Sequence, residues 1–147
     1  MEIRPYIASD EKAVAALWRE VFPDAPAWNE PEKDIKRKLT VQREFFLVAV
    51  DGGKLIGTAM AGFDGHRGWV YYVAVSPSHR RRGVGAALMQ RVEKDLVEFG
   101  CPKLNLQVRS SNEEAKGFYI RLGYQVEDRI SMAKRLPGNE ETTRRDD

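Results

Sequence analysis

Hydrophobic and polar residues follow two periods along this chain, one typical of strands and one typical of helices. In the clearest helical stretch the apolar residues share one face: Val84, Leu88, Val92, Leu96 and Phe99. The pattern predicts strands at 3–6, 45–50, 55–63, 69–75 and 103–108, two more within 124–135, and helices at 10–21, 31–39, 83–99 and 111–122. This order predicts a mixed α+β fold, in which a largely antiparallel sheet is flanked by helices.

Turn and capping residues support several of these boundaries. Asp51-Gly52-Gly53-Lys54 predicts a hairpin between the second and third strands. Ser111 and Glu114 have the spacing of a capping box and predict the start of the last helix there.

The chain has 147 residues, of which 42% are hydrophobic and 31% charged, which suits one domain with its own core. We expect a single domain over 1–136. The segment 137–147 is polar and charged and begins with Pro-Gly, so we expect it to be a flexible tail.

Charge and composition exclude several classes of protein. There are 24 basic and 22 acidic residues, so a basic surface for nucleic acid could only be local. The apolar runs 45–50 and 69–75 are far shorter than the ~20 residues of a membrane-spanning helix. Cys101 is the single cysteine and there are two histidines, too few ligands for a usual zinc site. We expect a cytoplasmic protein with no metal, membrane or nucleic-acid partner.

The stretch 69–86 carries the most chemical information. An apolar strand leads into the basic loop Arg80-Arg81-Arg82 and then into a helix that begins with Gly83 and Gly85. Glycines allow a ligand to approach the backbone, and a helix N-terminus attracts anions. A P-loop would need Lys-Ser/Thr where Ala86-Ala87 stands, and a dinucleotide fingerprint would need a third Gly or Ala where Leu88 stands.

The residues Arg80-x-x-Gly83-x-Gly85 resemble the acetyl-CoA signature of the GCN5-related N-acetyltransferase (GNAT) family. A second family element follows at the expected distance: Asn112-x-x-Ala115-x-x-Phe118-Tyr119-x-x-x-Gly123-Tyr124. Locally, Leu106-x-Val108-Arg109-x-Ser111-Asn112 is similar to ribosomal-protein N-acetyltransferases. The turn Asp64-Gly65-His66-Arg67-Gly68 is similar to that of bacterial YpeA-type acetyltransferases.

The resemblance implies the GNAT fold, in which the fourth and fifth strands splay apart and the arm of acetyl-CoA lies between them. It implies acetyl-CoA as co-substrate and direct transfer of the acetyl group to a primary amine, of a small molecule or of a protein. Tyr119 stands where the family places its general acid. The residues implied to bind acetyl-CoA are Val73, Ala74, Val75, Arg80, Arg81, Arg82, Gly83, Val84, Gly85, Ala86, Asn112 and Tyr119.

The general base stays open. The ribosomal-protein acetyltransferases use a glutamate where this chain has Gln107, which cannot act as a base. Asp64, His66 or a water relay could serve instead, although Asp64 and His66 are equally explained as turn residues.

Other interpretations stand beside this one. Asn112 could simply cap its helix, and Tyr119 could be a half-buried core residue. Of the neighbours Tyr71 and Tyr72, we expect one to pack inside. The chain could also be a non-catalytic acyl-CoA-binding or regulatory module, or a nucleic-acid-binding domain that uses 80–82. The resemblance allows a homodimer.

Overall fold

The computed structural model describes residues 1–26 and 28–137. They fall into two units: a larger one of residues 1–25 and 29–107, and a smaller one of 26–28 with the chain from 108 onward. The single domain expected over 1–136 stays a prediction. Residues 138–147 of the predicted tail lie outside the described residues.

The larger unit is built on one mixed sheet. Its strands lie in sequence order, antiparallel except for the last pair, which is parallel. The strands are β1 (Glu2–Pro5), β2 (Phe46–Asp51), β3 (Lys54–Phe63), β4 (Gly68–Val75) and β5 (Leu104–Asn105). The predicted α+β fold is therefore confirmed, including the hairpin at 51–54, where Gly52 and Gly53 both adopt a positive φ.

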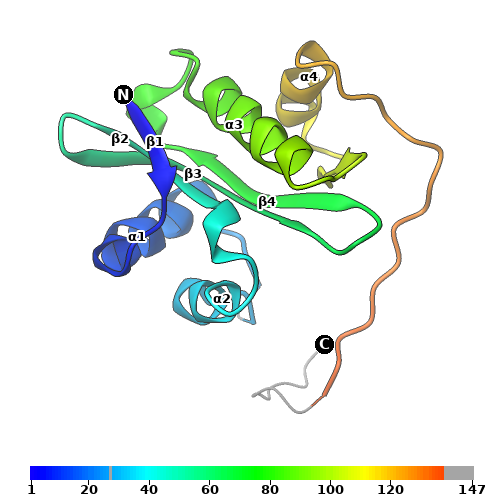
Figure 1. Cartoon of the computed structure of the whole chain (residues 1–147), viewed down its shortest axis with the longest axis horizontal. Helices are drawn as coiled ribbons and strands as arrows, with labels where there is room; N and C mark the ends of the chain where they lie inside the picture. The colour runs from blue at the N-terminus through cyan, green and yellow to red at the C-terminus, as the bar shows by residue number, and fades with distance from the viewer. Residues whose placement is uncertain (27, 138–147) are drawn as a thin grey trace. The chain divides into compact units, whose positions relative to one another are not determined.

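Helices cover both faces of this sheet (Figure 1). On one face lie α1 (Glu11–Val21) and α2 (Pro31–Lys38), and on the other lies α3 (Val84–Glu98). Short 3₁₀ turns at Ala8–Asp10, Arg43–Phe45 and Pro77–His79 join the elements. In the smaller unit the described residues form α4 (Glu113–Arg121).

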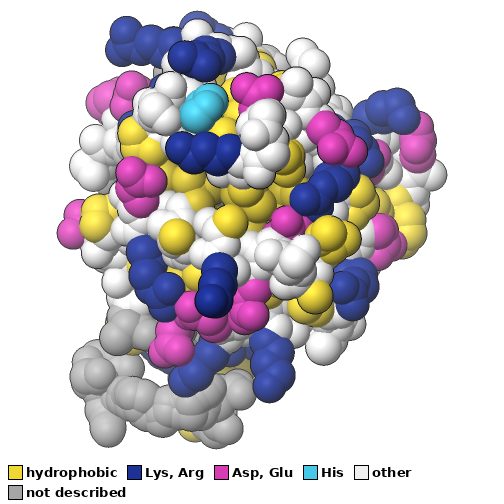
Figure 2. Space-filling model, turned by 90° about the vertical axis from the view of Figure 1, so that its left-hand side faces the viewer, with side chains coloured by type: hydrophobic (Ala, Val, Ile, Leu, Met, Phe, Trp, Pro, Cys, Tyr) yellow, Lys and Arg dark blue, Asp and Glu magenta, His cyan; other side chains and the backbone are white. Residues whose placement is uncertain are grey.

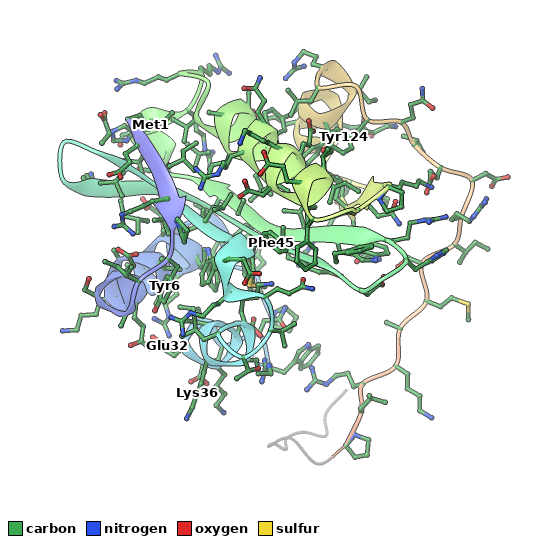
Figure 3. All side chains as sticks on the ribbon, in the orientation of Figure 1. Met1, Tyr6, Glu32, Lys36, Phe45 and Tyr124 are labelled. Carbon is green, nitrogen blue, oxygen red and sulfur yellow. The ribbon has the colours of Figure 1, made fainter. Side chains whose placement is uncertain are left out.

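The core follows the predicted apolar faces. On the α1 side, Val14, Leu17 and Trp18 pack against β2, where Phe46 and Val48 are fully buried. Tyr6, labelled in Figure 3, stacks on Phe46 with ring centroids 4.7 Å apart. On the α3 side the buried residues are Val84, Leu88, Met89, Val92 and Leu96. Each large apolar side chain buried in this way contributes about 1.5–3 kcal/mol.

Three predictions about the C-terminal third are wrong. The strand expected at 103–108 is reduced to Leu104–Asn105, and among the described residues 124–135 form no strand. Val126, Ile130 and Met132, whose spacing suggested strands, are 72%, 88% and 89% exposed. An alternating pattern becomes a strand only where a neighbouring strand supplies hydrogen-bond partners.

The third wrong prediction concerns the start of α4. The helix is capped by Asn112, whose Oδ1 accepts a hydrogen bond from the Ala115 amide at 3.0 Å, and not by Ser111. Ser and Asn are about equally good caps, so spacing alone could not choose between adjacent candidates.

Close packing of β3 on α3 gives a first prediction, at Gly57. A Cβ atom there would lie 3.0 Å from Leu88 Cδ1 and 3.1 Å from the carbonyl oxygen of Ala74. We expect Gly57→Ala to lower the free energy of unfolding by about 1–3 kcal/mol, because either α3 or β4 must move. Urea denaturation measures this. Gly117→Ala is the control and should not destabilise, because a Cβ atom there would meet only the end of the flexible Arg121 side chain, at 3.3 Å; equal stability of both variants would contradict the prediction.

Candidate active site

One edge of β4 is left open. β5 pairs with β4 only at Gly68–Leu104 and Trp69–Asn105. Beyond Trp69, no strand of the described chain lies against that edge as far as Val75. The predicted divergence of the fourth and fifth strands is therefore confirmed. Alternate backbone N–H and C=O groups of 70–75 face this edge, so an extended ligand could pair with them.

β4 is also bulged along the stretch that was predicted to bind the ligand. Its pairing with β3 shifts between Thr58 and Met60, so that Tyr72 and Val73 together lie opposite Ala59. Tyr72 has a φ of +53°, which is rare for a bulky residue. Its ring stacks on Trp18, whereas Tyr71 is 48% exposed. The expectation that one of the two tyrosines packs inside is confirmed.

The loop after β4 reverses the chain into α3. Arg80 Nε donates a hydrogen bond to the carbonyl oxygen of Val75 at 3.4 Å, which ties the loop to the end of the strand. Arg81 and Gly83 both have a positive φ, +64° and +80°. The side chains of Arg80, Arg81 and Arg82 are exposed.

The N-terminus of α3 is free of side-chain caps. Gly83 occupies the capping position, and a Cβ atom built on it would meet nothing within 4 Å. Val84 is buried and anchors the first turn, which contains no acidic residue, while Gly85 and Ala86 are half-buried. The first amides of a helix have no acceptor within the helix and lie at its positive end. Together with the three arginines, they can hold a phosphate group.

Basic side chains are most crowded at one end of the face drawn in Figure 2, but they are not confined to it. In Figure 2 lysine and arginine side chains gather at the upper end, the height at which loop 76–83 lies in Figure 1. Lower on the same face, basic and acidic side chains are interspersed.

Tyr119 and Asn112 belong to the smaller unit. Tyr119 is half-buried, with the rings of Phe118 and Tyr124 edge-on at 4.9 and 5.8 Å. Burial raises the pKa of Tyr119 to about 12, so its phenol is protonated at neutral pH. The Asn112 side chain caps α4, as one of its two interpretations required. The structure thus brings two of the predicted binding segments, 73–75 and 80–86, together, because β4, the loop and α3 follow one another directly in the chain.

Asp64 has a structural task in the turn between β3 and β4. Its Oδ1 accepts hydrogen bonds from the backbone amides of His66 and Arg67, at 2.8 and 2.7 Å. These bonds lower the pKa of the Asp64 carboxyl, which makes it a weaker base. Gln107 is exposed at the end of the larger unit.

Sequence reasoning missed a buried polar contact next to the bulge, in which Trp18 and the hydroxyl of Thr58 hold the backbone of Tyr72. A threonine inside an apolar strand was the only signal, and strands commonly contain threonine.

Comparison with known proteins decides the family, since the family model described as "Acetyltransferase (GNAT) family" matches residues 11–124. The chain belongs to the GNAT acetyltransferase family. An acetyltransferase of Yersinia enterocolitica is 47% identical over 136 residues, which cover 92% of this chain and 96% of the relative. The family resemblance inferred from the two motifs is therefore confirmed.

Solved GNAT structures share the fold at low identity. An aminoglycoside N-acetyltransferase in complex with CoA superposes with a TM-score of 0.76 at 20% identity, over 91% of this chain and 93% of that one. The ribosomal-protein-S18-alanine N-acetyltransferase of Escherichia coli gives a TM-score of 0.70 at 24% identity, over 83% and 76%. Among the described residues, no helix is long and apolar enough to span a membrane.

Proposed function

We propose that this GNAT protein transfers the acetyl group of acetyl-CoA directly to a primary amine. The observation that carries the proposal is the open edge of β4, which leads through the arginine loop into the uncapped N-terminus of α3. An extended arm that ends in a pyrophosphate matches this order of groups, because a strand edge suits the arm and a helix N-terminus suits the anion.

Each predicted binding residue has a task in this proposal. The backbone of Val73, Ala74 and Val75 pairs with the amide groups of the pantetheine arm. The amides of 82–86 and the guanidinium groups of Arg80, Arg81 and Arg82 surround the pyrophosphate. Gly83 leaves the space that the phosphate oxygens occupy. The family resemblance assigns Asn112 to the arm as well, in addition to its capping bond.

The transfer itself needs no nucleophile from the protein. The acceptor nitrogen attacks the thioester carbonyl carbon, the carbon–sulfur bond breaks, and the departing thiolate takes a proton from the Tyr119 hydroxyl. The proton lost by the nitrogen passes to the base, and exchange with solvent then removes it from the base and returns a proton to Tyr119. Tyr119 is suited to this task because it remains protonated at neutral pH. The turn bonds of Asp64 favour His66 or a water relay as the base.

The acceptor is proposed only as a primary amine. Solved proteins of this fold include one named for aminoglycosides and one named for the alanine of a ribosomal protein. Because Gln107 replaces the glutamate used by the latter class, we favour a small amine over a protein N-terminus. A cytoplasmic location and a homodimer stay predictions.

Calorimetric titration with acetyl-CoA and CoA, at two salt concentrations, tests the first step. We expect saturable binding at one site per chain, followed by thiol release when a panel of amines is added. Binding without thiol release from any amine would favour the non-catalytic acyl-CoA-binding module. Absence of binding to both ligands would overturn the proposal, and salt-sensitive binding to nucleic acid would then favour the remaining alternative.

A further inference from the structure

The hydroxyl of Thr58 on β3 links helix α1 to the backbone of β4. Its Oγ1 accepts a hydrogen bond from Trp18 Nε1 at 2.9 Å and donates one to the carbonyl oxygen of Tyr72 at 2.8 Å. Thr58 is fully buried and Trp18 is 1% exposed. A polar group this deep is costly unless it is hydrogen-bonded, and here the Thr58 hydroxyl is satisfied as both acceptor and donor, while the buried indole N–H of Trp18 has its acceptor.

The carbonyl that Thr58 holds belongs to the strained residue of the bulge. Tyr72 has a positive φ, a conformation that costs about 1–2 kcal/mol for a residue with a side chain. Three contacts hold it there besides the Thr58 bond. Its ring stacks on Trp18 with centroids 3.7 Å apart, Phe22 packs edge-on at 5.6 Å, and its hydroxyl donates to Asp34 Oδ2 at 2.5 Å. Strain that is held from several sides at once is typical of functional sites.

The bulge directs the backbone that follows it. A bulge inserts one extra residue and so changes which backbone groups face each edge of the strand. Val73, Ala74 and Val75 come directly after Tyr72, on the stretch that β5 leaves open. The position of the Tyr72 carbonyl therefore sets which N–H and C=O groups this open edge presents.

We propose that Trp18 and Thr58 are positioning residues for acetyl-CoA: their hydrogen-bonded pair locks the bulge at Tyr72 and so aligns the open edge of β4 with the thioester arm. The inference rests on the proposed function. Loss of the pair should weaken acetyl-CoA binding and slow turnover by more than an equal loss of stability elsewhere in the core would, although neither side chain faces the ligand.

Thr58→Val is the direct test, because valine keeps the shape of threonine and removes both hydrogen bonds. We expect the Kd for acetyl-CoA to rise about tenfold, equivalent to ~1.4 kcal/mol, with a further fall in kcat for the best amine. Thr58→Ser, which keeps the hydroxyl, should restore Kd to within about threefold of the wild type. Amide hydrogen exchange over 70–76 should be faster in Thr58→Val than in Thr58→Ser.

Val48→Ala is the matched control, since Val48 lies opposite Thr58 on β2, is fully buried in the apolar cluster that contains Trp18, and has an apolar side chain with no hydrogen bond to lose. It should lower the free energy of unfolding and leave Kd within about twofold. Should Thr58→Val be too unstable to purify, Trp18→Phe keeps an aromatic ring against Tyr72 and removes the indole N–H, with the same direction expected for Kd; because phenylalanine is also smaller than tryptophan, its Kd is compared with that of the cavity-forming control Val48→Ala.

The outcomes separate this proposal from the proposed function. Wild-type protein that binds no acetyl-CoA would overturn the proposed function and this inference with it. Wild-type protein that binds, together with an unchanged Kd and kcat in Thr58→Val, would overturn the inference alone and leave Thr58 a purely structural residue. Equal rises of Kd in Thr58→Val and Val48→Ala would also overturn it.

Discussion

Replacement of Tyr119 by phenylalanine is expected to lower kcat about 100-fold and to leave the affinity for acetyl-CoA within about twofold. A positioned general acid contributes roughly 10²–10⁴-fold to rate, and the hydroxyl is the only group that this substitution removes. The ring contacts with Phe118 and Tyr124 do not involve the hydroxyl, so packing in the smaller unit should be preserved. Stopped assays of thiol release, with calorimetry for affinity, measure the two effects separately.

The pH dependence gives an independent check on Tyr119. Burial favours the neutral phenol and raises its pKa to about 12, so the acid form is present throughout the range from pH 6 to 10. Loss of the Tyr119 proton should therefore cause no fall in kcat in that range. Tyr124→Phe is the matched control, because it removes a hydroxyl from the adjacent ring. A loss of affinity in Tyr119→Phe as large as the loss of kcat would make Tyr119 a binding or packing residue.

The sequence was sufficient wherever one local pattern decided the outcome. The apolar spacing of Val14, Leu17 and Trp18 gave α1 its buried face, and the Gly52-Gly53 turn determined the hairpin. The glycines and arginines before α3 were likewise interpretable, because a loop of that composition at a helix start has few other uses. These features depend on residues that are close together in the chain.

Features that depend on distant partners could not be predicted in the same way. The segment 124–135 has the alternation of strands, yet among the described residues it finds no strand to pair with. The bulge at Tyr72 depends on Thr58 and Trp18, which lie 14 and 54 positions earlier in the chain. Nothing in the local sequence of β4 requires a positive φ at a tyrosine, so only the assembled fold could reveal it.

The two parts of the site therefore differ in how the sequence encodes them. The anion-binding end is local, since 80–86 form one continuous segment with its own helix dipole. The strand end is not local, because the course of β4 at 73–75 follows contacts made by α1, β3 and, through Asp34, α2. Substitutions in α1 can therefore affect ligand binding at the strand end, whereas substitutions in 80–86 should affect only the anion-binding end.

A valine in place of Gly83 is expected to weaken acetyl-CoA binding about 100-fold. Gly83 has a φ of +80° and faces open space, so a side chain there would enter the volume assigned to the pyrophosphate. Loss of two hydrogen bonds to a charged group, at about 1.5–3 kcal/mol each, is enough for this change. Titration with acetyl-CoA measures it.

Two further variants distinguish a blocked site from a strained backbone. Gly100→Val places the same residue at the other end of α3, where φ is +95° and the surroundings are also open; it should lose about 1–2 kcal/mol of stability but bind acetyl-CoA normally. Gly83→Asn introduces a residue that tolerates a positive φ, so its stability should stay close to that of the wild type while its affinity falls. Normal binding by Gly83→Asn would show that the space beside Gly83 is not used by the ligand, because strain alone would then account for the valine variant.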